Sequence, residues 1–345
     1  MTYEYERVLT PASGLRLHLN ENTSGCSPAV IAALQALTRL DLASYPDYDT
    51  AIAACAARLR VPADWLLLTN GLDEGIFLAA LAALRGSSAA TVFEAIVVVP
   101  AFDMYAACTD AVGGRVVEIP LGRGFEFPLD AVIAAIGKRT RLIWLTNPNN
   151  PTGQIVPRDA IRRISAAASG ALVFVDEAYV DFCGETLLDD NALEGLANVV
   201  VGRTFAKAYG LAGLRAGALV GRPERLAAMR RAIPPYSLNV CAAAALPAAF
   251  GDIAYFDWYV DQVAQSRIML YDFFERRGVS YWKSAANFVL ARFDGQPGRV
   301  VAGLAARGVH VRDRSTDPGC AGCLRMTAGV TEHTQALLAA LEELL

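Results

Sequence analysis

The most informative part of this chain reads Val199-Val200-Val201-Gly202-Arg203-Thr204-Phe205-Ala206-Lys207-Ala208-Tyr209-Gly210-Leu211-Ala212-Gly213-Leu214-Arg215. Its first three residues form an apolar run, which predicts a buried strand that ends in a polar turn. A single lysine, Lys207, follows among small residues, and Arg215 lies further along. Such a lysine is either an ordinary surface residue or an amine held for Schiff-base chemistry, and this stretch alone leaves both interpretations open.

Two other stretches also place polar residues directly after an apolar run. Asn147-Pro148-Asn149-Asn150-Pro151-Thr152-Gly153 follows the apolar residues 142–145. Val173-Phe174-Val175-Asp176-Glu177-Ala178-Tyr179 places an acid at the carboxyl end of a further run. Ligands of open α/β sheets bind beyond the carboxyl ends of the strands. We therefore expect Asn150, Asp176 and Lys207 to meet at one site.

The rest of the chain alternates between short apolar runs and helical patterns. We expect strands at residues 65–69, 94–99, 115–119, 141–146, 171–176, 199–201 and 216–220, with helices at 49–60, 71–84, 130–136, 157–168 and 223–232. A break at 234–239 precedes long helices at 240–250 and 253–276, a strand at 288–293, a helix at 299–307, strands at 309–312 and 323–327, and a helix at 332–345. This alternation predicts β-α units and a mostly parallel sheet.

The composition excludes several classes of protein. A length of 345 residues suggests about two domains, and 54% hydrophobic with 19% charged residues allows a large core. A net charge of −4 argues against a nucleic-acid binder. We find neither an apolar run long enough to cross a bilayer nor a signal-peptide layout in Met1–Arg7, so we expect a cytoplasmic protein.

The cysteines and histidines do not indicate a metal site. Seven cysteines without framework spacing predict reduced thiols. Cys320-Ala321-Gly322-Cys323 is a lone C-x-x-C, whereas a zinc site would need a second pair. His18, His310 and His333 have no ligand spacing, and we expect neither a metal nor a histidine-based hydrolase.

Taken in order, these segments resemble the fold-type I pyridoxal-phosphate aminotransferases, and within them the histidinol-phosphate aminotransferase group. The resemblance extends from Asn20-Glu21-Asn22 to Arg325. It implies an α/β large domain, built on a mostly parallel sheet with helices on both faces, and a smaller α+β domain, as in aspartate aminotransferase. We place the N-terminal arm at 1–28, the large cofactor-binding domain at 29–235 and the small domain at 236–345.

The resemblance assigns pyridoxal 5'-phosphate as cofactor and gives roles around its ring. Lys207 would form the Schiff base, and Asp176 would face the ring nitrogen. Asn150 and Tyr179 would bind the ring's 3′ oxygen, and Tyr105 would stack on the ring. An aspartate after a strand is also a common helix cap, and an aromatic residue at a helix start is often core filler.

The resemblance also gives a phosphate cup. Asn70-Gly71-Leu72-Asp73 starts a helix after a strand, an arrangement whose free N–H groups hold phosphate. The cup would consist of the backbone of Leu72 and Asp73, the Thr204 hydroxyl, the Arg215 guanidinium and, from a partner subunit, Tyr45. Relatives usually carry serine where this chain has Ala206, so one phosphate hydrogen bond is expected to be missing.

Substrate anions need cations of their own. Arg325 matches the arginine that binds the carboxylate of an amino-acid substrate, and Arg312 matches a second arginine of the histidinol-phosphate group. Asn20 lies in a segment near the substrate, and Arg314 is interpreted as a surface residue. The implied activity is amino transfer from histidinol phosphate to 2-oxoglutarate in histidine biosynthesis, by a homodimer acting on small molecules, with no nucleic-acid or membrane partner.

Four other functions stay open at this point. An aromatic or broad-range aminotransferase, or a threonine-phosphate decarboxylase, would share the same lysine, acid and phosphate cup. A nicotinamide dehydrogenase rests on the glycines of residues 210–217, whose spacing is not G-x-G-x-x-G. A non-catalytic sensor using the same pocket would carry an added DNA-binding domain, whereas this chain starts directly in the enzyme-like region.

Overall fold

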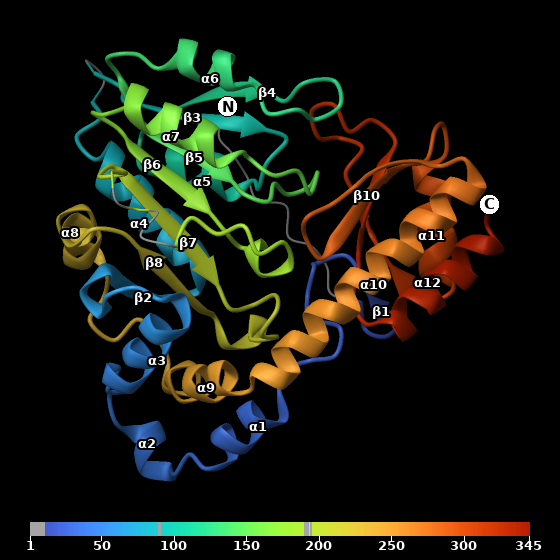
Figure 1. The fold of residues 1–345 in the computed structure, drawn as a ribbon, viewed down its shortest axis with the longest axis horizontal. Coiled ribbons are helices and arrows are strands. Elements are labelled where there is room, and N and C mark those ends of the chain that lie inside the picture. Colours follow the sequence, from blue (N-terminus) through green and yellow to red (C-terminus); the bar gives the residue numbers. More distant parts are fainter. Residues whose placement is uncertain (1–10, 89–90, 190–192, 194) are drawn as a thin grey trace.

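The computed structural model describes residues 11–345, with gaps at 89–90, 190–192 and 194. The first ten residues of the predicted N-terminal arm therefore lie outside the described residues. Within the described part, a seven-stranded sheet forms the centre of the larger part of the molecule, and a four-stranded sheet forms that of the smaller part (Figure 1).

The large sheet has the strand order β2-β8-β7-β6-β5-β3-β4. Its parallel strands are β3 (Glu94–Val99), β4 (Arg115–Pro120), β5 (Thr140–Thr146), β6 (Leu172–Asp176) and β7 (Val199–Thr204). β8 (Ala216–Val220) runs antiparallel to both β7 and β2 (Leu66–Asn70). The predicted α/β fold with a mostly parallel sheet is confirmed.

Helices cover both faces of this sheet because alternate residues of each strand point to opposite sides. In β6, Val173 and Val175 pack into one hydrophobic cluster, whereas Leu172 and Phe174 pack into another. The first cluster includes residues of α7, and the second includes residues of α4, α5 and α8. These helices are α4 (Gly71–Leu84), α5 (Met104–Ala111), α6 (Leu129–Ala135), which packs on α7 (Arg158–Ala167), and α8 (Pro223–Ala232).

Local sequence fixes several helix ends. α1 (Pro28–Gln35) begins after Ser27, whose side chain accepts a hydrogen bond from a backbone N–H of the first turn. α10 (Ile253–Arg277) ends at Gly278, which adopts the left-handed conformation with φ of 66°. Short helices that were not predicted from the sequence are α2 (Arg39–Ala43) and the 3₁₀ turns Ala63–Trp65, Val180–Phe182 and Ala212–Leu214.

The smaller sheet is antiparallel throughout, in the order β12-β13-β10-β9. Its strands are β9 (Ser280–Trp282), β10 (Phe288–Arg292), β12 (Arg312–Asp313) and β13 (Cys323–Thr327), with helices α10, α11 (Pro297–Ala306) and α12 (Thr331–Glu342) in the same part of the chain. The expected single strand at 309–312 is divided. β11 (Val309–His310) pairs with β1 (Leu15–Arg16) of the N-terminal arm, and Arg312 then joins β13.

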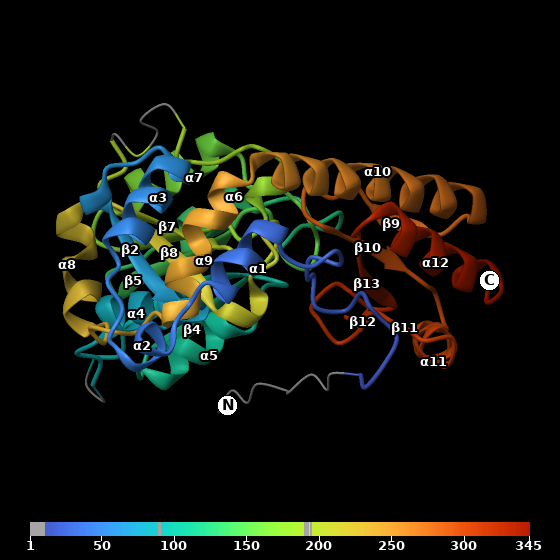
Figure 2. The same cartoon turned by 90° about the horizontal axis from the view of Figure 1, so that it is seen from below.

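The position of α9 bears on the domain boundary. α9 (Val240–Gly251) packs on α1 and on α3 (Asp49–Leu59), both of which belong to the large part. α10 then runs from the large part along the small one, as Figure 2 shows. The boundary after residue 235 stays a prediction, and these contacts favour a boundary at the start of α10.

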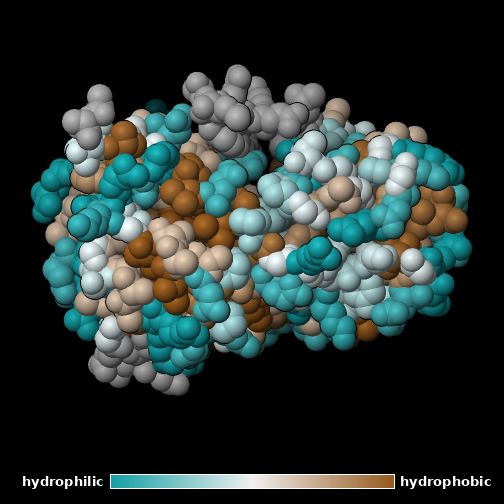
Figure 3. Space-filling view, turned by 90° about the horizontal axis from the view of Figure 1, so that it is seen from above, coloured by the Kyte–Doolittle hydropathy of each residue, from teal (hydrophilic) through white to brown (hydrophobic). Residues whose placement is uncertain are grey.

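The surface differs between the two parts. In the space-filling view of Figure 3, hydrophobic residues gather in a band on the left lobe, and hydrophilic residues cover most of the right lobe. Within the described residues, no single helix has the length and apolar composition needed to cross a membrane. α9 and α10 pass that test only as a pair, and they are bent by 79°.

Candidate active site

The predicted site residues meet in one cavity of about 440 Å³, which residues of both parts of the molecule line. Every residue predicted to bind cofactor or substrate lines it, except Tyr45. These are Asn20, Leu72, Asp73, Tyr105, Asn150, Asp176, Tyr179, Thr204, Lys207, Arg215, Arg312 and Arg325. Their convergence from distant parts of the sequence follows from the parallel sheet, whose carboxyl ends open at the cavity. The individual roles stay predictions.

Lys207 lies in the turn after β7 and extends into the cavity. Its Nζ donates a hydrogen bond to the backbone oxygen of Leu19 at 3.0 Å. The same nitrogen lies 5.8 Å from the centroid of the Tyr179 ring. The lysine is only partly buried, so its amine is accessible to a molecule in the cavity.

Asp176 ends β6 and is almost completely buried, with 3% of its surface exposed. The Tyr105 hydroxyl donates to Oδ2 at 2.6 Å, and the backbone N–H of Ala178 donates to Oδ1 at 2.9 Å. Burial raises the pKa of this carboxyl to about 6, although both hydrogen bonds act in the opposite direction. Asp176 therefore caps the following turn and also presents a carboxylate to the cavity.

Tyr105 is more deeply buried than a residue whose only role is to stack on a ligand would be. Its ring lies nearly parallel to that of Trp144, at 5.1 Å between centroids and 21° between planes, and 1% of Tyr105 is exposed. Thr146, at the end of β5, donates its hydroxyl to the Tyr105 oxygen at 3.0 Å. The structure thus gives Tyr105 a second task, which is to position and charge-stabilise Asp176.

Phe102 was not predicted from the sequence, and it lines the cavity just before α5. It is partly exposed and packs edge-on against Tyr105, with ring centroids 5.9 Å apart. Its exposure favours Phe102 over the buried Tyr105 for stacking on a flat ligand ring. An aromatic residue shortly after the β3 strand was the signal available in the sequence.

Asn150 and Tyr179 face the same cavity from the ends of β5 and β6. The Asn20 side-chain amide donates to the Tyr179 hydroxyl at 3.1 Å. Arg325, on β13, donates to the Asn150 side-chain oxygen and, at 2.7 Å, to the backbone oxygen of His18. These bonds connect the N-terminal arm, the large sheet and the small sheet at one place, so the arm forms part of the cavity wall.

The start of α4 forms a cup with Arg215. Gly71 adopts φ of +76°, and a Cβ at this position would come within 2.6 Å of the Arg215 Nη2 atom. Arg215 itself adopts the left-handed conformation and pairs with Asp73 at 2.8 Å. Glycine suits the positive φ at this position and lets the guanidinium lie beside the free N–H groups of the helix start, since a Cβ would displace it.

Three arginines line the cavity from the small part of the chain. Burial lowers the pKa of Arg325 to about 10, so this side chain remains charged at neutral pH. Arg312 is partly buried beside it in the wall. The interpretation of Arg314 as a surface residue is wrong, because it is 7% exposed and forms an ion pair with Asp317. A turn buries Arg314 by returning the chain from Asp317 to β13, which the sequence pattern did not reveal.

Tyr45 does not reach this cavity in its own chain. It is 78% exposed and stacks on Tyr236, with ring centroids 4.1 Å apart. An exposed pair of tyrosines is compatible with the predicted contact to a partner subunit, which stays a prediction.

The family was determined by comparison with known proteins. A model of the family "Aminotransferase class I and II" matches residues 12–341. The chain belongs to this family.

A histidinol-phosphate aminotransferase of Cupriavidus pinatubonensis is 36% identical over 349 aligned positions, covering 98% of this chain and 90% of the relative. A crystal structure described as a putative histidinol-phosphate aminotransferase from Erwinia carotovora atroseptica has a TM-score of 0.86 at 25% identity, covering 97% of this chain and 98% of that one. The histidinol-phosphate aminotransferase of Sinorhizobium meliloti, solved with pyridoxal-5'-phosphate, shares the fold with a TM-score of 0.85 at 24% identity, covering 96% and 90%. The predicted resemblance is confirmed.

This aminotransferase is an enzyme that uses pyridoxal phosphate, and its cavity fits that group. Arg215 and the α4 start suit a phosphate, Asp176 suits a protonated ring nitrogen, and Lys207 suits an aldehyde carbon. The fit of Gly71 against Arg215 supports the phosphate position, since a Cβ there would displace the guanidinium. Ala206 lines the cavity and brings no hydroxyl to it.

The histidines, cysteines and carboxylates are the side chains that could ligate a metal ion. No group of three or more His, Cys, Asp or Glu residues in the described part of the chain is arranged to hold one. The cysteines are free, and Cys320 and Cys323 are both buried.

Proposed function

We propose that this chain transfers the amino group of histidinol phosphate to 2-oxoglutarate, with pyridoxal phosphate held by Lys207. The observation that carries the proposal is that an amine, a buried carboxylate, a phosphate cup and three arginines line a single cavity. The names of its relatives support the choice of substrate, and the cluster of cations supports a substrate with a strongly anionic group.

Pyridoxal phosphate, when bound, supplies a sink for the electrons that remain when the substrate Cα–H bond breaks. Asp176 stabilises positive charge at the ring nitrogen, because its carboxylate is buried and oriented by Tyr105. Lys207 Nζ would take the proton from the substrate Cα and deliver it to the cofactor's 4′ carbon, and would move a proton in the opposite direction when the oxo-acid acceptor receives the amino group. Within the described residues its amine donates to a backbone oxygen of the arm and makes no ion pair, so no carboxylate holds it away from the substrate.

The arginines account for the two anions that alternate in the site. Arg325 is fixed by Asn150 and by the backbone of the arm, so it offers a prearranged guanidinium to a carboxylate or a phosphate. Arg312 and Arg314 add charge on the same side of the cavity. The ion pair with Asp317 limits the net charge there and leaves Arg325 and Arg312 as the principal partners.

We infer that the protein works as a cytoplasmic homodimer. Leu40, Leu42, Tyr45 and Tyr236 are exposed hydrophobic side chains, between 51% and 78% exposed, and burial against a second copy would remove them from water. Tyr45 would then complete the partner's phosphate cup. Mixing a Tyr45→Ala protein with a Lys207→Ala protein tests this role, because only a mixed dimer regains one complete site.

The central experiment is Lys207→Ala, with Lys283→Ala as a control on an unrelated lysine. The substitution should abolish amino transfer and the absorption band of lysine-bound cofactor, while the control keeps both. A yellow, active Lys207→Ala protein would show that another amine carries the reaction.

The choice of substrate needs a separate assay. Purified enzyme is supplied with histidinol phosphate, phosphothreonine or phenylalanine, and both amino transfer and CO₂ release are followed. The proposal requires histidinol phosphate to have the highest kcat/KM. CO₂ release from phosphothreonine would instead identify a decarboxylase, and preference for phenylalanine an aromatic aminotransferase.

A further inference from the structure

A second cavity of about 240 Å³ is lined by the end of α3, the segment after β6, β7 with the turn that follows it, and the start of α10. The lining residues on which the argument depends are Arg58, Arg60, Asp181, Gly184, Asp189 and Arg203. None of them takes part in the chemistry proposed above.

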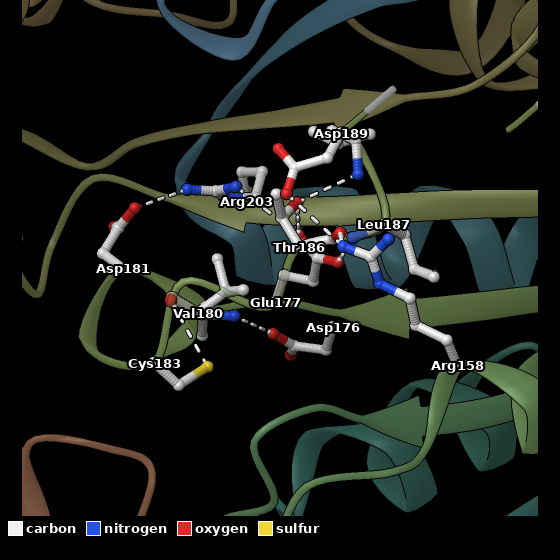
Figure 4. Close-up of polar contacts among 12 residues, drawn as sticks. Arg158, Asp176, Glu177, Val180, Asp181, Cys183, Thr186, Leu187, Asp189 and Arg203 are labelled. Atoms are coloured by element: carbon white, nitrogen blue, oxygen red, sulfur yellow. Dashed lines mark hydrogen bonds and ion pairs between the residues drawn. The ribbon is translucent and has the colours of Figure 1, made fainter. Parts of the chain in front are cut away.

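The carboxylates around this cavity are already paired within the protein (Figure 4). Arg203 is buried and donates to Asp181 at 2.6 Å, and it also pairs with Glu177 at 3.5 Å. Asp189 pairs with Arg158 at 3.4 Å. Asp181 and Glu177 share Arg203, so these three carboxylates face two guanidiniums, and the further positive charge beside the cavity comes from Arg58 and Arg60.

Arg58 has no carboxylate partner among the described residues. Its Nε donates to the Tyr209 hydroxyl at 2.7 Å, and its guanidinium carbon lies 4.4 Å from the centroid of the Phe256 ring. These contacts fix the plane of the guanidinium, and within the described residues its two Nη atoms make no hydrogen bond or ion pair. A planar fork held in place with unused donors is the arrangement that binds oxyanions bidentately.

Arg203 offers no further donor to the cavity, because its two Nη atoms are paired with Asp181 and Glu177. Its Nε is buried and has no hydrogen-bond partner in the described part of the chain. The residue is 4% exposed and lines the cavity. Because this nitrogen has almost no accessible surface, an oxygen atom in the cavity cannot reach it, and Arg203 serves the wall through its pairs with Asp181 and Glu177. Arg60, exposed at the rim, adds positive charge without a carboxylate partner among the described residues.

We propose that this cavity is a binding site for a small oxyanion, a phosphate or a carboxylate, held by Arg58 with Arg60 at the rim. The volume lies below the range of about 300–1,000 Å³ typical of drug-sized ligands, so it suits a small ion or the anionic end of a small metabolite. The site stands apart from the amino-transfer cavity, and the proposal does not depend on which amine the enzyme uses.

Gly184 offers a matched pair of variants for the test. It lines the cavity with φ of +73°, and a Cβ there would meet no atom within 4 Å. Asparagine and aspartate both tolerate this backbone conformation. Gly184→Asn adds bulk alone, whereas Gly184→Asp adds the same bulk with a negative charge that repels an anion. Neither substitution removes a contact of Arg58 or Arg203.

Binding of inorganic phosphate to the holoenzyme is measured by isothermal titration calorimetry. Bound cofactor occupies the phosphate cup, and an Arg325→Lys background weakens binding at the substrate arginines. In this background, Gly184→Asn should bind phosphate within about 3-fold of the unsubstituted cavity, and Gly184→Asp at least about 10-fold more weakly. Arg58→Gln should also lose the binding.

Equal phosphate affinity of Gly184→Asp and Gly184→Asn would overturn the proposal. So would the absence of phosphate binding in the Arg325→Lys background at millimolar concentration. If Arg58→Gln does not fold, the two Gly184 variants decide the question alone, because they leave the arginine contacts in place.

Discussion

Asp176→Asn tests two effects of the buried carboxylate separately: its cost to the folding free energy and its role in the reaction of the cofactor. The side chain is buried at the end of β6, and burial raises its pKa from the ordinary 3.8 to about 6. In the cofactor-free protein this burial outweighs the two hydrogen bonds and the Lys207 charge, all of which favour the ionised carboxylate. We expect the asparagine variant to unfold less readily than the wild type at neutral pH and to be inactive as an enzyme.

The magnitude follows from the two pKa values. A difference of about 2 units corresponds to about 3 kcal/mol, at 1.36 kcal/mol per unit. The folded state binds the proton more tightly than the unfolded state, so the unfolding free energy of the wild type falls as the pH rises from about 4 to about 6. Asparagine does not titrate, so the unfolding free energy of the variant does not fall over this pH range through residue 176. Its stability relative to wild type should therefore increase by about 2–3 kcal/mol between about pH 4 and about pH 8.

Urea unfolding of both cofactor-free proteins across this pH range provides the measurement, with equal m-values as the check on two-state behaviour. Comparing the two proteins at each pH removes the contributions of all other titrating groups. Asp64→Asn, which removes an exposed carboxylate, serves as the control for loss of a charge. A stability difference that does not change with pH would refute the reasoning, because it would mean that Asp176 carries no burial cost.

Three further outcomes are expected. Tyr105→Phe removes a donor that stabilises the ionised Asp176, so the pKa of Asp176 should rise further. When cofactor affinity is measured by fluorescence quenching as a function of pH, its acid limb should move up by about 1–2 pH units, and an unmoved limb would contradict this role. Arg325→Lys should raise KM for a dicarboxylate acceptor about 10- to 100-fold in steady-state kinetics, because lysine has no planar fork that could bind Asn150 and the substrate together. An unchanged KM would show that Arg325 does not bind the acceptor. Ala206→Ser supplies the phosphate-binding hydroxyl that this chain lacks, and it should tighten cofactor binding about 10-fold in equilibrium titration. Unchanged affinity would show that other donors already satisfy the cofactor phosphate.

The sequence by itself determined the order of elements and the residues at their ends. Apolar runs with β-branched residues must become buried strands, and the polar residues that follow them must emerge at one edge of a parallel sheet. Asn150, Asp176 and Lys207 could therefore be grouped from their places in the sequence alone. α10 was likewise predicted almost to its ends, because helix periodicity and the capping glycine at 278 act over a few residues.

Only the tertiary structure decided which side chains face one another across the cavity. Arg325 and Asn150 are 175 residues apart, and Tyr105 and Asp176 are 71 apart, so no local pattern encodes these hydrogen bonds. The burial of Arg314 likewise depends on a turn that brings Asp317 beside it. Local propensity fixes where a strand or helix lies, whereas the direction and charge state of a side chain depend on how separate elements pack and exclude water.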